Sequence, residues 1–208
     1  MEGRSIKEIA RLLDVSQSSV SLWVRDLELT AHQRHYLDQR ARVLRVEGRR
    51  EYWRERRRTF QDHGRHLARQ RDAFHVAGCM LYWAEGSKSR NVAQICNADP
   101  EVLRFFARFL RMYFDVSDDK FRVTCNLFAD HIDRQTEIEQ FWLDTLELPR
   151  SSLCCSIVNV YSKYSQKKRK NRLPCGTCRL SVHSTAVVQS IFGAIQEYGG
   201  FERPEWLG

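Results

Sequence analysis

The densest group of side chains able to bind a ligand is a set of arginines in the first third of the chain. Residues 31–72 hold thirteen basic side chains, all of them arginine, against six acidic ones. Arginine grips phosphate oxygens with two parallel N–H bonds, so this composition favours a phosphate backbone as the ligand. The alternative is a solvated helix in which Glu47, Glu51 and Glu55 pair with arginines one turn away. The candidates for phosphate contact are Arg49, Arg50, Arg54, Arg57 and Arg58.

A second polar group occupies alternate positions of two predicted strands, residues 121–127 and 178–183. Their apolar positions alternate with the polar ones, which is typical of half-buried strands. The outward positions are Arg122, Thr124, Asn126, Arg179, Ser181 and His183. Solvated faces ordinarily mix charges, so a face without acids indicates contact with nucleic acid. A basic run in the expected hairpin loop is either solvated or adds phosphate contacts, and it contains Lys167, Lys168, Arg169 and Lys170.

Three patterns bear on metal or nucleotide chemistry. Cys175 and Cys178 have the spacing of a zinc or redox pair, and Cys154 and Cys155 could add ligands. Cys154 and Cys155 are adjacent and would point to opposite faces of a strand, so both cannot easily bind one metal. Cys178 falls among the inward positions of its strand, so a place in the strand core is the favoured interpretation. Residues 130–133, Asp-His-Ile-Asp, fit a helix cap with an exposed histidine better than a metal site. No phosphate-binding glycine loop or dinucleotide motif is present, which argues against kinase or dehydrogenase chemistry.

The elements that would carry these groups begin with two short helices. Ser5 and Glu8 have the spacing of a capping box, which predicts a helix start. The break at residues 14–16 suits a left-handed aspartate followed by a serine cap, and a second helix is expected over residues 17–27. A third helix is expected over residues 30–46. The apolar side chains expected to be buried in this unit are Ile9, Ala10, Leu13, Val15, Val20, Trp23, Val24, Tyr36, Leu37, Val43 and Leu44.

This arrangement resembles the helix-turn-helix units of bacterial DNA-binding proteins. The resemblance implies that the second helix enters the major groove, where glutamine and serine bond base edges and arginine reaches guanine or phosphate. The residues that would face the duplex are Gln17, Ser18, Ser21, Leu22 and Arg25. An ordinary helical hairpin from a protein core is the alternative.

The remainder of the chain alternates helices with strands. We therefore predict an α+β fold with three parts: a helix-turn-helix unit over residues 1–46, an arginine-rich helical connector over residues 47–72, and a mixed helix and antiparallel-sheet domain over residues 73–208. Strands are expected at residues 91–97, 121–127, 153–161 and 178–183, and helices at residues 73–85, from Asp99, at 133–146 and from Ser184 to Gly199.

Residues 77–87, Ala-Gly-Cys-Met-Leu-Tyr-Trp-Ala-Glu-Gly-Ser, end like the LAGLIDADG helix of homing endonucleases, and residues 95–116 resemble the strand and helix that follow it. The chain resembles bacterial proteins that join a helix-turn-helix to such a domain. The resemblance implies that Glu85 binds a divalent metal such as Mg²⁺, which activates water over the scissile phosphate. With one copy of the motif, cleavage needs a homodimer on a roughly palindromic site. The family also includes non-cutting regulators, and Glu85 could simply pair with Lys88 or Arg90.

Composition sets the outer limits of these interpretations. The chain has 208 residues, a net charge of +8 and 42% hydrophobic residues, so it can bury a core and suits a polyanionic partner. It has no long apolar run and no signal-like start, so we expect a cytoplasmic protein that does not enter a membrane. The favoured hypothesis is a sequence-specific protein for double-stranded DNA, either a regulator or an accessory to recombination. The alternatives are a Mg²⁺-dependent endonuclease and an RNA-binding or assembly protein.

Overall fold

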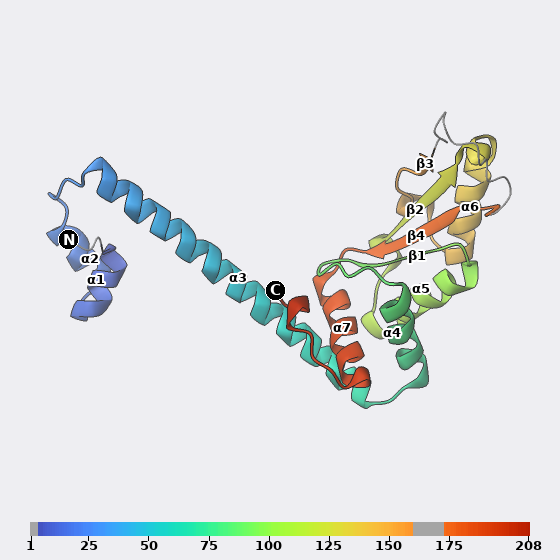
Figure 1. Cartoon of the computed structure of the whole chain (residues 1–208), viewed down its shortest axis with the longest axis horizontal. Helices are drawn as coiled ribbons and strands as arrows, with labels where there is room; N and C mark the ends of the chain where they lie inside the picture. The colour runs from blue at the N-terminus through green and yellow to red at the C-terminus, as the bar shows by residue number, and fades with distance from the viewer. Residues whose placement is uncertain (1–3, 160–172) are drawn as a thin grey trace. The chain divides into compact units, whose positions relative to one another are not determined.

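The computed structural model describes residues 4–159 and 173–208, and within them the fold is α+β, as predicted (Figure 1). The chain divides into two compact units, residues 1–54 and residues 55–208. The helices and strands of the described residues are α1 (Ile6–Leu13), α2 (Gln17–Trp23), α3 (Ala31–Arg69), α4 (Ala73–Glu85), β1 (Ala93–Asn97), α5 (Pro100–Phe114), β2 (Phe121–Phe128), α6 (Gln135–Leu146), β3 (Ile157–Asn159), β4 (Thr177–Val182) and α7 (Thr185–Gly199).

The caps at the start of the chain are those expected. The Ser5 side chain accepts a hydrogen bond from the Glu8 amide, and the Glu8 carboxylate accepts one from the Ser5 amide at 2.9 Å. Asp14 is left-handed with φ 53°, and Ser16 caps α2 by accepting from the Ser19 amide at 3.0 Å. The second helix ends at residue 23, however, four residues earlier than predicted.

The expected third helix and the expected connector are one helix. α3 begins after Thr30, whose hydroxyl accepts from the Gln33 amide, and continues without a break for 39 residues. No proline interrupts it, and arginine and glutamate are good helix formers. At about 1.5 Å per residue this helix is roughly 58 Å long, whereas α1 and α2 are about two turns each. Most of α3 therefore extends beyond what the short helices can cover.

Far fewer side chains are buried in the described part of the first unit than the sequence predicted. Among its described residues only Ala10 and Val20 are buried. The expected core positions Leu13 and Trp23 are 57% and 61% exposed, and Val43 and Leu44 are 54% and 55% exposed. Of the remaining positions, Ile9, Val15, Val24 and Leu37 are half-buried and Tyr36 is exposed. The amphipathic pattern identified the side chains that favour burial, but no described element covers them.

The second unit is built on a four-stranded sheet in the order β1-β4-β2-β3. β4 pairs antiparallel with both β1 and β2, but β3 runs parallel to β2. The expected hairpin between the third and fourth strands is therefore wrong, and β3 has three described residues rather than the nine expected. The chain passes through α6 between β2 and β3, and a helical crossover of this kind permits parallel pairing.

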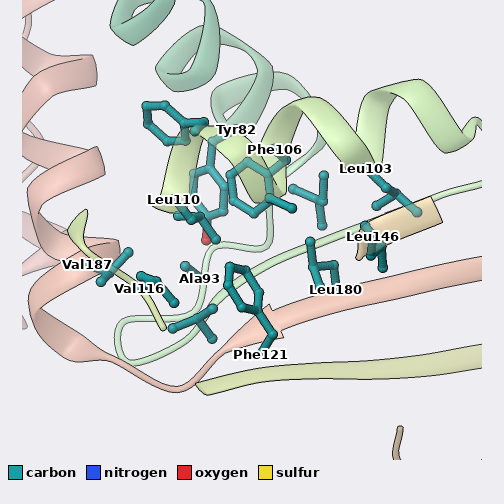
Figure 2. Packing of buried hydrophobic residues seen from close by; sticks show 14 of the residues in the cluster. Tyr82, Ala93, Leu103, Phe106, Leu110, Val116, Phe121, Leu146, Leu180 and Val187 are labelled. Carbon is teal, nitrogen blue, oxygen red and sulfur yellow. The ribbon is translucent and has the colours of Figure 1, made fainter. Parts of the chain in front are cut away.

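One face of this sheet and the helices above it form the core (Figure 2). Ile95, Val123 and Leu180 project from the inner face, where they are at most 1% exposed. Tyr82 of α4 and Phe106 of α5 stack above them, with ring centroids 5.6 Å apart. The other face of the sheet lacks such a cover.

The last turns of α3 belong to the second unit and pack against α7. Gln61 donates to the Gln189 side chain at 2.8 Å and accepts from that of Gln196 at 3.0 Å, with all three residues buried. The helices approach so closely that a Cβ on Gly64 would lie 1.8 Å from the carbonyl oxygen of Ser190. This segment is therefore part of the domain and not a free linker.

Candidate nucleic-acid interface

The open face of the sheet presents polar side chains in register. Neighbouring strands align them in three rows, and no carboxylate lies in any row. The rows are Gln94, Ser181 and Arg122, then Cys96, Arg179 and Thr124, then Thr177, Asn126 and Ile157. The sequence predicted the contributions of β2 and β4. It missed Gln94, Cys96 and Thr177, although the alternation in residues 93–97 carries the same signal.

Hydrogen bonds orient the centre of this face. The Asn126 amide nitrogen donates to the Thr177 hydroxyl at 3.3 Å and to the Cys96 sulfur at 3.5 Å. These two bonds use the nitrogen of the Asn126 amide, and its oxygen is an acceptor for which no partner occurs within the described residues. Ser181 is only 6% exposed and donates to the Arg122 carbonyl, so it is not available for a ligand as expected.

The two arginines of the face differ in their surroundings. One Arg122 nitrogen donates to the carbonyls of Asp119 and Phe121, both at 2.7 Å, which fixes the guanidinium at the start of β2. Arg179 is half-buried at the centre of its row, and its guanidinium makes no hydrogen bond or ion pair within the described part of the chain. Neither side chain is paired with a carboxylate there, so each keeps its charge for an outside partner.

The arginines of α3 also fall into distinct classes. Arg49 and Arg50 are exposed and make no ion pair with any described residue. Arg54 lies 3.7 Å from Glu51 and Arg58 lies 2.7 Å from Glu55, so both are partly neutralised. Arg57 donates twice to the Leu207 carbonyl, at 2.9 and 2.6 Å, and anchors the C-terminal segment. The structure thus gives this predicted phosphate ligand a packing role.

The α2 side chains predicted to face a duplex are exposed, but they line a groove within the first unit. Gln17, Ser18, Ser21 and Leu22 form one wall. The groove has a volume of about 1310 Å³, and its other walls are largely aliphatic, formed by Ile6, Ile9, Val24, Leu27, Leu29, Leu37 and Ala41. Arg25 lies beyond the end of α2, 3.6 Å from the Asp26 carboxylate.

Glu85, the candidate metal ligand, is exposed as the last residue of α4. It has no ion pair among the described residues. Lys88 does not pair with it, because the Lys88 ammonium donates to the carbonyls of Trp83 and Gly86, both at 2.8 Å. Partial burial, with Arg203 nearby, lowers the pKa of Lys88. No group of three His, Cys, Asp or Glu in residues 4–159 and 173–208 is placed to hold a metal ion.

The remaining candidates have structural roles. Cys178 is buried on the inner face of the sheet, where burial raises the pKa of its thiol, which opposes the thiolate that zinc requires. His131 was expected to be exposed; instead it is buried and its Nδ1 accepts from the Phe128 amide at 3.3 Å. His183 is exposed after β4. The basic run predicted at residues 167–170 lies outside the described residues.

Comparisons with models of protein families, with curated proteins and with solved structures found no match for this chain. Among the described helices, none has both the length and the apolar character needed to cross a lipid bilayer.

Proposed function

We propose that this chain binds double-stranded DNA through the open face of the sheet in its second unit. The observation that carries the proposal is the set of three aligned rows without a carboxylate. Arg122 and Arg179 suit phosphate, while Gln94, Thr124 and Asn126 offer amide and hydroxyl groups that suit base edges. The role would be that of a regulator or of an accessory to recombination.

Two further surfaces support the proposal. Arg49 and Arg50 on α3, which make no ion pair with the residues that the structure describes, supply cations for sequence-independent phosphate contact. The helix-turn-helix interpretation adds Gln17, Ser18, Ser21, Leu22 and Arg25 as readers of base sequence, and the two short helices are capped where the sequence predicts. The order of α4, the acid-Gly-Ser ending, β1 and α5 is consistent with a LAGLIDADG-like domain as the second DNA surface.

The test compares two double variants of the full chain that lose equal charge. Arg122→Ala/Arg179→Ala removes both cations of the face, whereas Arg104→Ala/Arg134→Ala removes two cations that pair with glutamates on α5 and α6. We expect the first to weaken binding to a mixed-sequence duplex about tenfold and the second to change it less than twofold. Equal losses would mean that overall charge, and not this face, binds DNA. Stronger competition by RNA than by duplex DNA would favour an RNA-binding function.

The second candidate function is Mg²⁺-dependent DNA cleavage by a homodimer. The observation in its favour is that Glu85 is exposed and forms no ion pair within residues 4–159 and 173–208. The resemblance would bring two copies of this carboxylate to one metal site. Incubation of a supercoiled plasmid library with the chain and Mg²⁺ should then give breaks that disappear in Glu85→Gln. Identical cleavage by wild type and variant would remove Glu85 from catalysis, and intact plasmid in both would leave DNA binding alone as the proposed function.

A further inference from the structure

Among the described residues, most of the large hydrophobic side chains that are exposed lie in the first unit. Eighteen such side chains are exposed among the described residues, and thirteen of them lie before residue 55. With each about half exposed, they leave on the order of 1000 Å² of apolar surface in water, which is comparable with the ~800 Å² that each partner buries in a standard protein interface. Four of the thirteen, Ile6, Leu22, Leu27 and Leu29, line one groove together, and an exposed apolar patch of this kind marks an interaction surface.

The groove described above is the concave part of this surface. Leu22 and Leu27 are 65% and 68% exposed, and Ile6 and Leu29 are 38% and 43% exposed. A volume of about 1310 Å³ exceeds the ~300–1000 Å³ of a small-molecule pocket, so the groove is sized for polypeptide. The aliphatic walls suit an apolar occupant, while the polar groups lie on the α2 wall and at the rim.

The charges of this region permit a second copy to approach. Residues 4–41 carry six basic and five acidic side chains, so two copies of this part do not repel each other. Residues 42–58 of α3 carry eight basic and three acidic side chains, so two such stretches would repel. A self-contact is therefore favoured at the groove and disfavoured along the arginine stretch.

The rim of the groove is also self-complementary. Lys7 lies on the α1 wall and Asp38 on the α3 wall. In a two-fold contact the same patch occurs on both partners, so the α1 wall of one copy can meet the α3 wall of the other. Leu27 and Leu29, on the segment between α2 and α3, line the same groove and add exposed apolar surface to this contact.

We infer that the occupant of this groove is a second copy of the chain, joined by a two-fold contact in which Lys7 of each copy faces Asp38 of the other. The inference does not depend on DNA binding. It differs from the homodimer that cleavage would need, because Glu85 belongs to the other unit.

Charge reversal gives the test, with sedimentation of the full chain as the measurement. We expect the wild type to dimerise at micromolar concentration, and Lys7→Glu and Asp38→Lys each to weaken dimerisation about tenfold. An equal mixture of the two variants should regain wild-type affinity, because the heterodimer restores both attractive contacts. Arg11→Glu makes the same charge change on α1 outside the groove and should leave dimerisation unchanged.

Each other outcome overturns the inference. If the wild type is still monomeric at about 100 µM, well above the micromolar dissociation constant expected, no such contact exists. If the double variant Lys7→Glu/Asp38→Lys regains wild-type dimerisation but the mixture of the two single variants does not, the two side chains meet within one chain, which then closes its own groove. Loss of duplex binding in Lys7→Glu without any change in dimerisation would place DNA there. The Arg122→Ala/Arg179→Ala variant should dimerise normally, so the two proposals fail separately.

Discussion

Glu139 illustrates how a single carboxylate holds the second unit together. It is only 5% exposed on α6, yet it accepts from Gln135 at 2.8 Å, Ser156 at 2.7 Å and Arg150 at 2.7 Å. Burial alone raises the pKa of Glu139, but the three donors and the Arg150 charge outweigh it, so the pKa falls below 4.5. The carboxylate therefore ties the segment before β3 to α6 in its ionised form.

This gives a prediction about acid stability. A carboxyl whose pKa is lowered by folding stabilises the protein above its unfolded pKa, near 4.5, and loses that contribution as the pH falls through the folded value. Glu139→Gln should lower the free energy of unfolding by about 1–3 kcal/mol at pH 7 and by progressively less below pH 4.5. Urea unfolding at several pH values measures this. A difference from wild type that is constant with pH would show that packing, and not charge, is lost.

At the scale of elements, local sequence signals succeeded and long-range ones failed. The bounds of α4 were predicted from its apolar pattern and from the glycine after its end, and the start of α5 from Asp99 and Pro100. The Asp72 cap at the start of α4 was not recognised. The strand that pairs with β3 was not predicted, because alternation shows which side chains point inward but not which strand lies alongside. For the candidate site, the polar positions of β2 and β4 were found and the alternation in residues 93–97 was overlooked. Only the register shows that the polar positions of β1 share rows with those of β4 and β2.

The contact between α3 and α7 supports a matched prediction on two glycines of one helix. A Cβ on Gly64 would collide with the backbone of Ser190, whereas one on Gly48 would meet nothing within 4 Å. Gly64→Ala should destabilise the protein by about 3 kcal/mol, and Gly48→Ala should stabilise α3 by about 0.5–1 kcal/mol. Denaturant unfolding and helical circular dichroism measure the two effects. Equal effects at both positions would mean that α3 does not pack against α7 this closely in solution.

At the scale of the whole molecule, the two units divide hydrophobic burial unequally. The second unit encloses its core between helices and one face of a sheet, and five large hydrophobic side chains are exposed in its described part. The first unit is amphipathic throughout but encloses almost nothing. The sequence predicted a buried core at the apolar positions of this unit, and that prediction is wrong except at Ala10 and Val20. It assumed that the third helix would cover these positions.

Because α2 forms a wall of the groove, dimerisation and base reading by α2 compete for the same side chains. Gln17, Ser18 and Ser21 cannot contact a duplex while a second copy covers them. The two equilibria are linked: if dimerisation lowers the affinity of α2 for a duplex by some factor, binding of that duplex lowers the affinity of the dimer by the same factor.

We therefore expect excess short duplex to convert the dimer into complexes of one chain with one duplex. The variant Gln17→Ala/Ser21→Ala should reduce this conversion. Sedimentation with labelled DNA distinguishes the species. If the dimer instead binds DNA intact, with the variant behaving as wild type, DNA contact is confined to the sheet and α3, and α2 serves self-association alone.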